Sequence, residues 1–319
     1  MLRVLTFVAL LVLGVVGVVA YLVVLPWISL PDEPAAEIDA RWAEVEAWSA
    51  ATPDSAGPLD ELQRALASAQ RTKVEVDAVD GPALARVDLD DDARAAIDQL
   101  VAWHDRGGGL GPDPCVTEAD GLKPAIDIIR ALDLAKLAIA SADSPDDPAV
   151  VAAVHLGAAL RGRGGALFGV VGVTIADAVR TRAVARGWPV TAALRAGAPH
   201  MREFFPIVAR DVTCTVRLAE RAVDEGELGE ASGWRGLLQR RVGMERELTM
   251  LKWYEGRRLA AAHAVVDDPV ALREALTHPP PEQLPRSLLI RGMAFDIAAK
   301  VDSFRGMVAA YDAFVRGSP

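Results

Sequence analysis

The chain has 319 residues and a net charge of −10, and 51% of its residues are hydrophobic, with few aromatic residues among them. This length allows one large domain or two modest ones, and the prevalence of alanine and leucine favours helix over sheet. The acidic balance argues against a nucleic-acid partner, because binding to nucleic acid depends on neutralising phosphates with basic residues.

The first segment is an uncharged run over residues 4–30, which is long enough to cross a bilayer. It exceeds the apolar part of a typical signal peptide and ends without a small-residue cleavage site, so we predict an uncleaved transmembrane anchor over residues 1–31. A cleaved signal peptide is the alternative. Arg3 precedes the run and acidic residues follow it, and the positive-inside rule then predicts a cytoplasmic N-terminus. Residues 32–319 are expected on the periplasmic side of the inner (cytoplasmic) membrane.

Residues 32–89 are predicted to form an acidic helical region beside the anchor. Residues 32–120 contain 21 acidic and 7 basic side chains, whereas the rest of the chain is nearly balanced. This acidity indicates either a solvated surface or a region that repels anionic lipids or binds a cationic partner. Helices are predicted over residues 34–51 and 58–70. The first has four apolar side chains on one face, namely Ile38, Trp42, Val45 and Trp48.

Residues 90–319 are predicted to form one further α-helical domain, which gives about ten helices and no convincing strand in total. Asp90 is expected to cap one helix, and Ser144 another, with the following proline in the first turn. A long helix is predicted over residues 234–265 and a final one over residues 289–315. The expected fold class is all-α, either solenoid-like or an irregular bundle.

The alanine-rich helix pairs around residues 122–187 resemble the tetratricopeptide-like repeats of α-solenoid proteins. The resemblance covers about residues 90–225 and lies in the architecture, because the tetratricopeptide consensus is not met and no repeat of fixed length is found. The layout is also similar to that of membrane-anchored envelope proteins of GC-rich bacteria that have no assigned activity. A GC-rich genome also accounts for 29 arginines against 5 lysines and for the absence of asparagine. The resemblance implies an interaction surface, with another envelope protein as the partner.

A glycine-rich stretch, RGRGGALFGVVGV, covers residues 161–173. Leu167 stands where the dinucleotide-binding fingerprint needs a glycine, and a helix is predicted ahead of the stretch where that motif needs a strand. The uncharged part is also too short to cross a membrane. The stretch is predicted instead to be a turn and a helix with small residues on one face, against which a neighbouring backbone packs closely. These residues are Gly165, Gly169, Gly172 and Ala176.

Cys115 and Cys214 are the only two cysteines. In an exported domain two cysteines can form a disulfide, because the compartment is oxidising. The sequence leaves two possibilities open: a Cys115–Cys214 disulfide, or two free cysteines buried in the core.

Most catalytic signatures are absent. The chain has no HExxH, GxSxG, SxxK or P-loop motif, and no paired ExxH motif of a di-iron bundle. His200 and Glu203 place a base and an acid one turn apart at a helix start. Otherwise the histidines lie in separate segments, as expected of surface or core residues. They are His104, His155, His200, His263 and His278.

The acidic cluster at residues 88–92 resembles the opening of a calcium loop, with carboxylates at the first, third and fifth positions. Ala93 and Gln99 stand where an EF-hand needs glycine and glutamate. Helix capping by Asp90, with two acids in the first turn, explains the cluster without a metal. We therefore predict no metal, no cofactor and no assigned catalytic residue.

The predicted helix over residues 234–265 is rich in basic and aromatic side chains. It is either a contact surface for anionic lipid, glycan or an acidic protein, or a solvated face with internal Glu–Arg pairs. The candidate partner-contact residues are Arg240, Arg241, Trp253, Tyr254, Arg257 and Arg258.

These observations favour a membrane-tethered, non-enzymatic helical scaffold that binds another component of the bacterial envelope. One alternative is an exported helical enzyme of the cell-wall or glycan hydrolase type, with carboxylates that the sequence does not identify. Another is a ligand-sensing or assembly factor, although no cytoplasmic output domain is found. Whether the protein is an enzyme is left open by the sequence.

Overall fold

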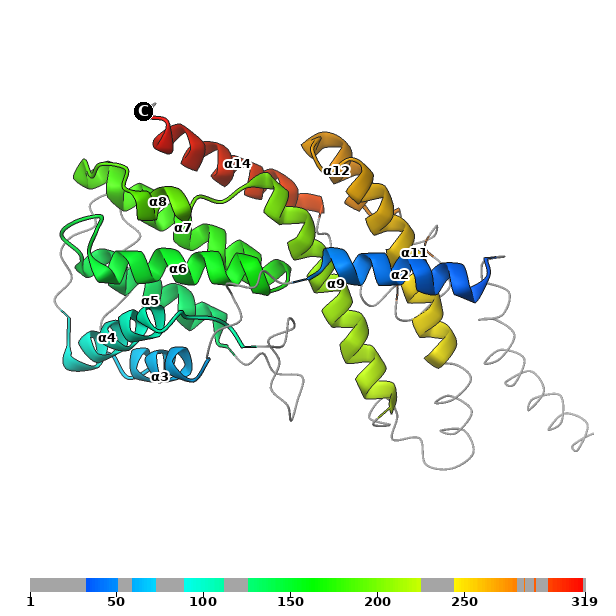
Figure 1. Ribbon diagram of the computed structural model, residues 1–319, viewed down its shortest axis with the longest axis horizontal. Coiled ribbons are helices and arrows are strands. Elements are labelled where there is room, and N and C mark those ends of the chain that lie inside the picture. Colours follow the sequence, from blue (N-terminus) through cyan, green and yellow to red (C-terminus); the bar gives the residue numbers. More distant parts are fainter. Residues whose placement is uncertain are drawn as a thin grey trace, which may run out of the picture. The chain divides into compact units, whose positions relative to one another are not determined.

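The computed structural model describes residues 33–50, 59–72, 89–111, 126–224, 244–279, 284, 290 and 298–317. Within these ranges the chain is all-α and has no strand (Figure 1), as the composition predicts. None of the described helices is both long and apolar enough to cross a membrane. The predicted anchor, over residues 1–31, lies outside the described residues. The described helices are α2 (Ala35–Trp48), α3 (Asp60–Ala69), α4 (Asp91–Asp105), α5 (Ile128–Ser141), α6 (Pro148–Arg163), α7 (Ala166–Arg186), α8 (Ala192–Ala196), α9 (Met201–Asp224), α11 (Met244–Ala264), α12 (Pro269–Leu276) and α14 (Ala298–Val315).

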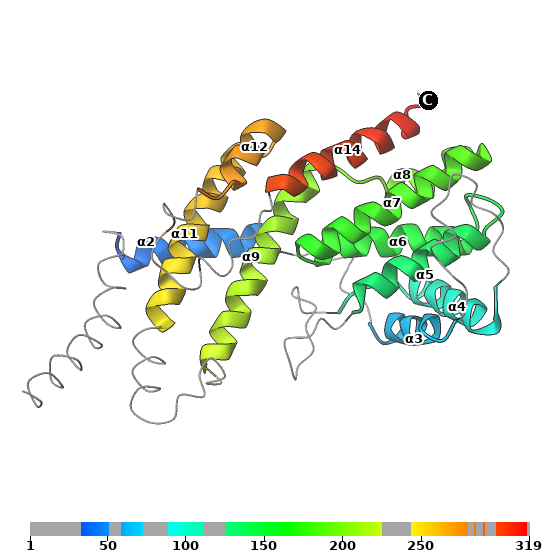
Figure 2. The same ribbon diagram turned by 180° about the vertical axis from the view of Figure 1, so that it is seen from behind.

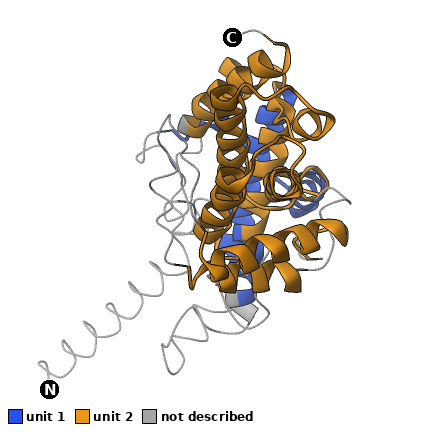
Figure 3. Cartoon of the chain, turned by 90° about the vertical axis from the view of Figure 1, so that its left-hand side faces the viewer, with its two compact units in different colours: residues 1–45, 215–264, 275–296 blue, residues 46–214, 265–274, 297–319 orange. Residues whose placement is uncertain are grey.

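The chain divides into two compact units, coloured separately in Figure 3. Unit 1 comprises residues 1–45, 215–264 and 275–296, and unit 2 comprises residues 46–214, 265–274 and 297–319. The boundary falls inside helices α2, α9 and α12, each of which contributes to both units. This division differs from the predicted one at residues 89 and 90, because unit 2 contains both sides of that position.

Most of the described apolar side chains buried in unit 2 belong to one core. Helices α3 to α7 each pack against the next one in the chain, and α14 packs on α7 (Figure 1, Figure 2). Leu62 and Leu66 of α3 are buried in the same core as Leu100 and Trp103 of α4. The predicted acidic region therefore does not end at a domain boundary, since α3 and α4 share their buried apolar surface.

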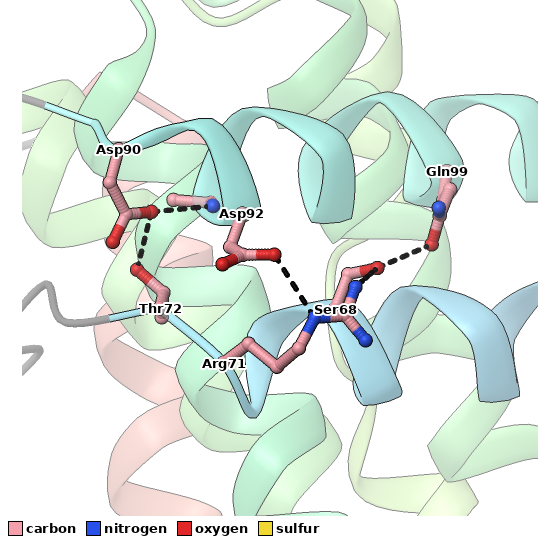
Figure 4. Close-up of polar contacts among 7 residues, drawn as sticks. Ser68, Arg71, Thr72, Asp90, Asp92 and Gln99 are labelled. Atoms are coloured by element: carbon pink, nitrogen blue, oxygen red, sulfur yellow. Dashed lines mark hydrogen bonds and ion pairs between the residues drawn. The ribbon is translucent and has the colours of Figure 1, made fainter.

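Polar contacts between α3 and α4 account for the acidic cluster at the start of α4 (Figure 4). The carboxylate of Asp90 accepts hydrogen bonds from the backbone nitrogen of Ala93 at 2.7 Å and from the Thr72 hydroxyl at 2.8 Å. Arg71 forms an ion pair with Asp92 at 3.0 Å. Asp90 is thus the N-cap that the sequence predicts.

The start of α6 differs from the prediction. Asp147, and not Ser144, is the N-cap: its carboxylate accepts a hydrogen bond from the backbone nitrogen of Ala149 at 2.9 Å, and Pro148 occupies the first helical turn. Ser144 and Asp147 both precede a proline in this stretch, so the sequence offers two similar starts. The helix begins after the second of these two residues. Pro148 then lies in the first turn, where its missing backbone N–H breaks no hydrogen bond of the helix.

Candidate functional site

A pocket of about 1000 Å³ lies within unit 2. Helix α6 lines it with His155, Ala158, Ala159 and Gly162, which are spaced so that they share one face of the helix. Three of these four side chains are small or absent, which leaves room beside the helix. The first turns of α9 supply further lining residues, and Trp48 contributes an aromatic side chain.

The polar lining divides into a buried floor and an exposed rim. The floor consists of Arg161 and Arg210, each only 2% exposed. The rim consists of His200, Arg202 and Asp267, which are all exposed. Ligands that enter from the solvent would therefore meet the rim first and the two buried guanidinium groups last.

Arg161 is held by partners on every nitrogen of its guanidinium group. Its Nε donates to the Glu203 carboxylate at 2.8 Å, and its two terminal nitrogens donate to the backbone oxygens of Gly172 at 3.2 Å and Gly197 at 2.9 Å. These partners belong to α9, to α7 and to the end of α8. Arg161 thereby joins four helices of unit 2, so its role in the floor is structural.

Arg210 has a different environment. Its Nε donates to the backbone oxygen of Pro206 at 3.2 Å, whereas its Nη1 is buried and has no hydrogen-bond partner among the described residues. Burial and, next, the charge of Arg163 lower the pKa of Arg210 to about 10, while Glu203 acts in the opposite direction. Arg210 therefore keeps its positive charge at neutral pH, and it does so in a buried position where no described residue forms an ion pair with it.

Both carboxylates of the pocket are already engaged by arginines. Glu203 pairs with Arg161, and Asp267 pairs with Arg202 at 3.2 Å across the rim. The predicted acid and base, Glu203 and His200, do lie in the same pocket. The described residues contain no group of three or more histidine, cysteine or acidic side chains that could hold a metal ion.

Two of the scattered histidines meet beside the pocket. The rings of His104 and His155 lie 4.9 Å apart between centroids, and His155 also contacts the Trp103 ring edge-on. Burial and, next, His155 lower the pKa of His104. His155 is hydrogen-bonded to the backbone oxygen of Gly108 at 2.9 Å. His263 is exposed on α11 in unit 1.

The predicted partner-contact helix corresponds to α11 in its described part, and Arg240 and Arg241 lie outside the described residues. Arg258 is buried, pairs with Glu255 at 2.6 Å and donates to the backbone oxygen of Leu276 at 2.8 Å. Trp253 donates to the Glu33 carboxylate at 2.8 Å.

The other two candidates on α11 differ in exposure. Tyr254 is hydrogen-bonded to His278 at 2.8 Å, and burial, with a smaller effect of Glu255, raises its pKa to about 12. Arg257 is exposed and lies 5.4 Å from the Trp253 ring centroid. Most of the described candidates therefore have partners within unit 1, and Arg257 is the one exposed to solvent among them.

The predicted small-residue face of α7 packs against more than one neighbour. A Cβ atom on Gly169 would lie 2.6 Å from the Ile207 side chain of α9, and one on Gly172 would lie 2.4 Å from the backbone oxygen of Gly157 on α6. Gly165 is the N-cap of α7, outside the helix, and its Cβ would meet Asp211 at 2.6 Å. Ala176 packs with Ala198 and Tyr311. The glycines thus allow close approach of both α6 and α9.

Cys214 lies on α9 and is disulfide-bonded. Cys115, the only other cysteine of the chain, lies outside the described residues. The Cys115–Cys214 disulfide accordingly stays a prediction.

We expect non-reducing peptide mapping of the alkylated protein to recover one cross-linked peptide that contains both Cys115 and Cys214, because the chain has no third cysteine to compete. The same digest after reduction serves as the control and should lose this peptide. Alkylation of both cysteines without prior reduction would contradict the prediction.

Sequence reasoning missed the two buried arginines of the pocket. A signal was available, since Arg161 follows a long uncharged stretch of α6 and Arg210 lies in the apolar sequence FFPIVARDV. A charge within an apolar helical pattern marks a buried polar site, because burying a charge is costly without compensation. Comparison of the chain with protein-family models, curated proteins and solved structures gives no match.

Proposed function

We propose that this chain is a membrane-tethered, non-enzymatic helical protein of the bacterial cell envelope that binds another envelope component through the pocket of unit 2. The uncharged run over residues 4–30 supports a single membrane anchor with a cytoplasmic N-terminus. Residues 32–319 are then periplasmic. The packing of successive helices in unit 2 supports a solenoid-like arrangement, an architecture that often presents a binding surface.

The main support for this proposal is that both carboxylates of the pocket form ion pairs with arginines. A glycan hydrolase needs two carboxyl groups, one to act as an acid and one as a base or nucleophile. In the pocket, Glu203 is tied to Arg161 and Asp267 to Arg202. Each carboxylate of the pocket therefore already has an arginine partner, which favours binding over cleavage.

Site-specific crosslinking in living cells of the source bacterium tests the proposal. We expect a photoreactive amino acid in place of Arg202, whose side chain is 83% exposed at the rim, to crosslink reproducibly to one partner. Ile129 is 69% exposed in the same unit and does not line the pocket, so the same substitution there is the matched control.

A second control lacks residues 1–31, and its loss of the crosslink would tie the interaction to the membrane location. Equal crosslinking from positions 202 and 129, or none from position 202, would contradict a partner bound at the pocket. Release of sugar from cell-wall glycan by the purified protein would favour the hydrolase instead.

A further inference from the structure

Arg210 is the one feature of the pocket that the packing of unit 2 does not explain. It is 2% exposed, lines the pocket, and has a buried Nη1 without a hydrogen-bond partner among the described residues. An unpaired charge in a protein interior is costly, and natural structures normally compensate it with an opposite charge or a hydrogen-bonded network. The described residues supply neither at Nη1.

Arg161, the second arginine of the floor, provides an internal comparison. Its three nitrogens all have acceptors, one of which is the Glu203 carboxylate. The two arginines have the same chemistry and the same burial, yet Glu203 forms an ion pair only with Arg161. An acceptor for Arg210 is therefore expected from outside this part of the chain.

We propose that the pocket of unit 2 binds a ligand carboxylate that pairs with Arg210, while the apolar body of the ligand contacts Trp48 and the small residues of α6. This inference rests on the binding role proposed above for the pocket. A guanidinium group is suited to this ligand, because its planar set of donors matches the two oxygens of a carboxylate.

The charge of the pocket selects a carboxylate over a phosphate. Of the two arginines of the floor, only Arg210 has a buried terminal nitrogen without an acceptor among the described residues, since each nitrogen of Arg161 has one. A carboxylate carries one negative charge, which matches the one charge of the Arg210 side chain, whereas a phosphate monoester carries up to two. The excess charge of a phosphate would lie in the same pocket as Glu203 and Asp267.

The size and lining of the pocket indicate what else the ligand carries. A volume of about 1000 Å³ is at the upper end for small-molecule sites and far exceeds that of a single inorganic anion. Trp48 packs edge-on against Phe205, with ring centroids 5.7 Å apart, which holds the indole in place. An acidic side chain or a chain terminus of a partner protein, with apolar neighbours, has the required combination of groups.

The test uses three probes of similar size on the full-length chain in a neutral detergent: benzoate, its neutral analogue benzamide, and phenyl phosphate. We expect benzoate to raise the melting temperature in a concentration-dependent manner and benzamide to leave it unchanged, since a ligand that binds only the folded state stabilises it. Equal shifts with benzoate and benzamide would overturn the proposal. A larger shift with phenyl phosphate than with benzoate would overturn the choice of a carboxylate.

The variant Arg210→Met separates a binding role from a structural one. We expect it to weaken benzoate binding by at least about tenfold, as loss of a charged hydrogen bond implies, while the melting temperature without ligand stays the same or rises. A methionine fills a similar volume and removes the uncompensated charge. A lower melting temperature together with unchanged benzoate binding would show that Arg210 serves the fold alone.

The control is Arg94→Met, which removes an exposed arginine of α4 outside the pocket and should leave benzoate binding unchanged. The benzoate test and the crosslinking test can also fail independently of each other. A reproducible partner at position 202 without benzoate binding would overturn this inference and leave the proposed function standing, and benzoate binding without a partner would do the reverse.

Discussion

Replacing Arg161 with methionine is expected to lower the free energy of unfolding by about 3 kcal/mol. The side chain is 2% exposed, and its loss leaves the backbone oxygens of Gly172 and Gly197 without the donors that now reach them in the interior. Glu203 is one-third exposed, so water compensates its carboxylate and it contributes less to the loss. Urea unfolding followed by circular dichroism measures the change.

Arg180→Met is the matched control for this prediction. Arg180 also pairs with an acidic residue, Asp177, at 2.8 Å, but the pair is partly exposed on α7. Its loss should change the free energy of unfolding by no more than about 0.5 kcal/mol. If Arg161→Met and Arg180→Met had the same urea midpoint, Arg161 would not join the helices of unit 2 in the way that its hydrogen bonds indicate.

Replacing Gly172 with leucine is expected to destabilise unit 2 by a similar amount, about 3 kcal/mol, through overpacking. The first atom of any side chain at this position would lie 2.4 Å from the backbone oxygen of Gly157. A backbone oxygen inside a helix cannot move aside as the end of a side chain can, so α6 and α7 must separate. Gly169→Leu is expected to be milder, because its nearest obstacle is the Ile207 side chain. The melting temperature of each variant measures the effect.

The chain provides a control glycine in Gly306 of α14, which is exposed and would have nothing within 4 Å of its added Cβ. Gly306→Ala should raise the free energy of unfolding by about 0.5–1 kcal/mol, because alanine loses less backbone entropy in a helix. A melting temperature of Gly172→Leu equal to that of the unaltered protein would refute close packing of α6 on α7.

Local physical chemistry made much of the fold predictable from the sequence. The apolar spacing of the first described helix places Ile38, Trp42, Val45 and Trp48 on one face; the first three are buried and Trp48 is half-buried. The carboxylate of Asp90 caps α4, because capping depends only on residues within one turn. The choice between Ser144 and Asp147 was less accessible, since the two offer the same local signal and the helix uses the second.

Most of the candidate site could not be predicted from the sequence. His155, Glu203 and Asp267 are far apart in the chain, and only the packing of α6, α9 and the turn after α11 brings them to one pocket. Helix α11 gives a second example of what the sequence does not show. The basic and aromatic pattern left open a contact surface or a face with internal Glu–Arg pairs, and Arg258 is in fact buried in a pair with Glu255. Periodicity identifies a helix, but it does not say which of its polar residues find partners inside the protein.

The sequence by itself determined the helical class of this protein, the N-cap of α4 and the buried face of α2, because these depend on residues that are close in the chain. Only the tertiary structure decided which of Arg161 and Arg210 has acceptors for all its nitrogens. Both are arginines in apolar helical stretches, and both are 2% exposed. One lies within reach of a carboxylate and two backbone oxygens, whereas the other keeps a terminal nitrogen without an acceptor in the described chain. The free energy of a buried charge depends on the groups packed around it, and those groups come from helices that the sequence does not place together.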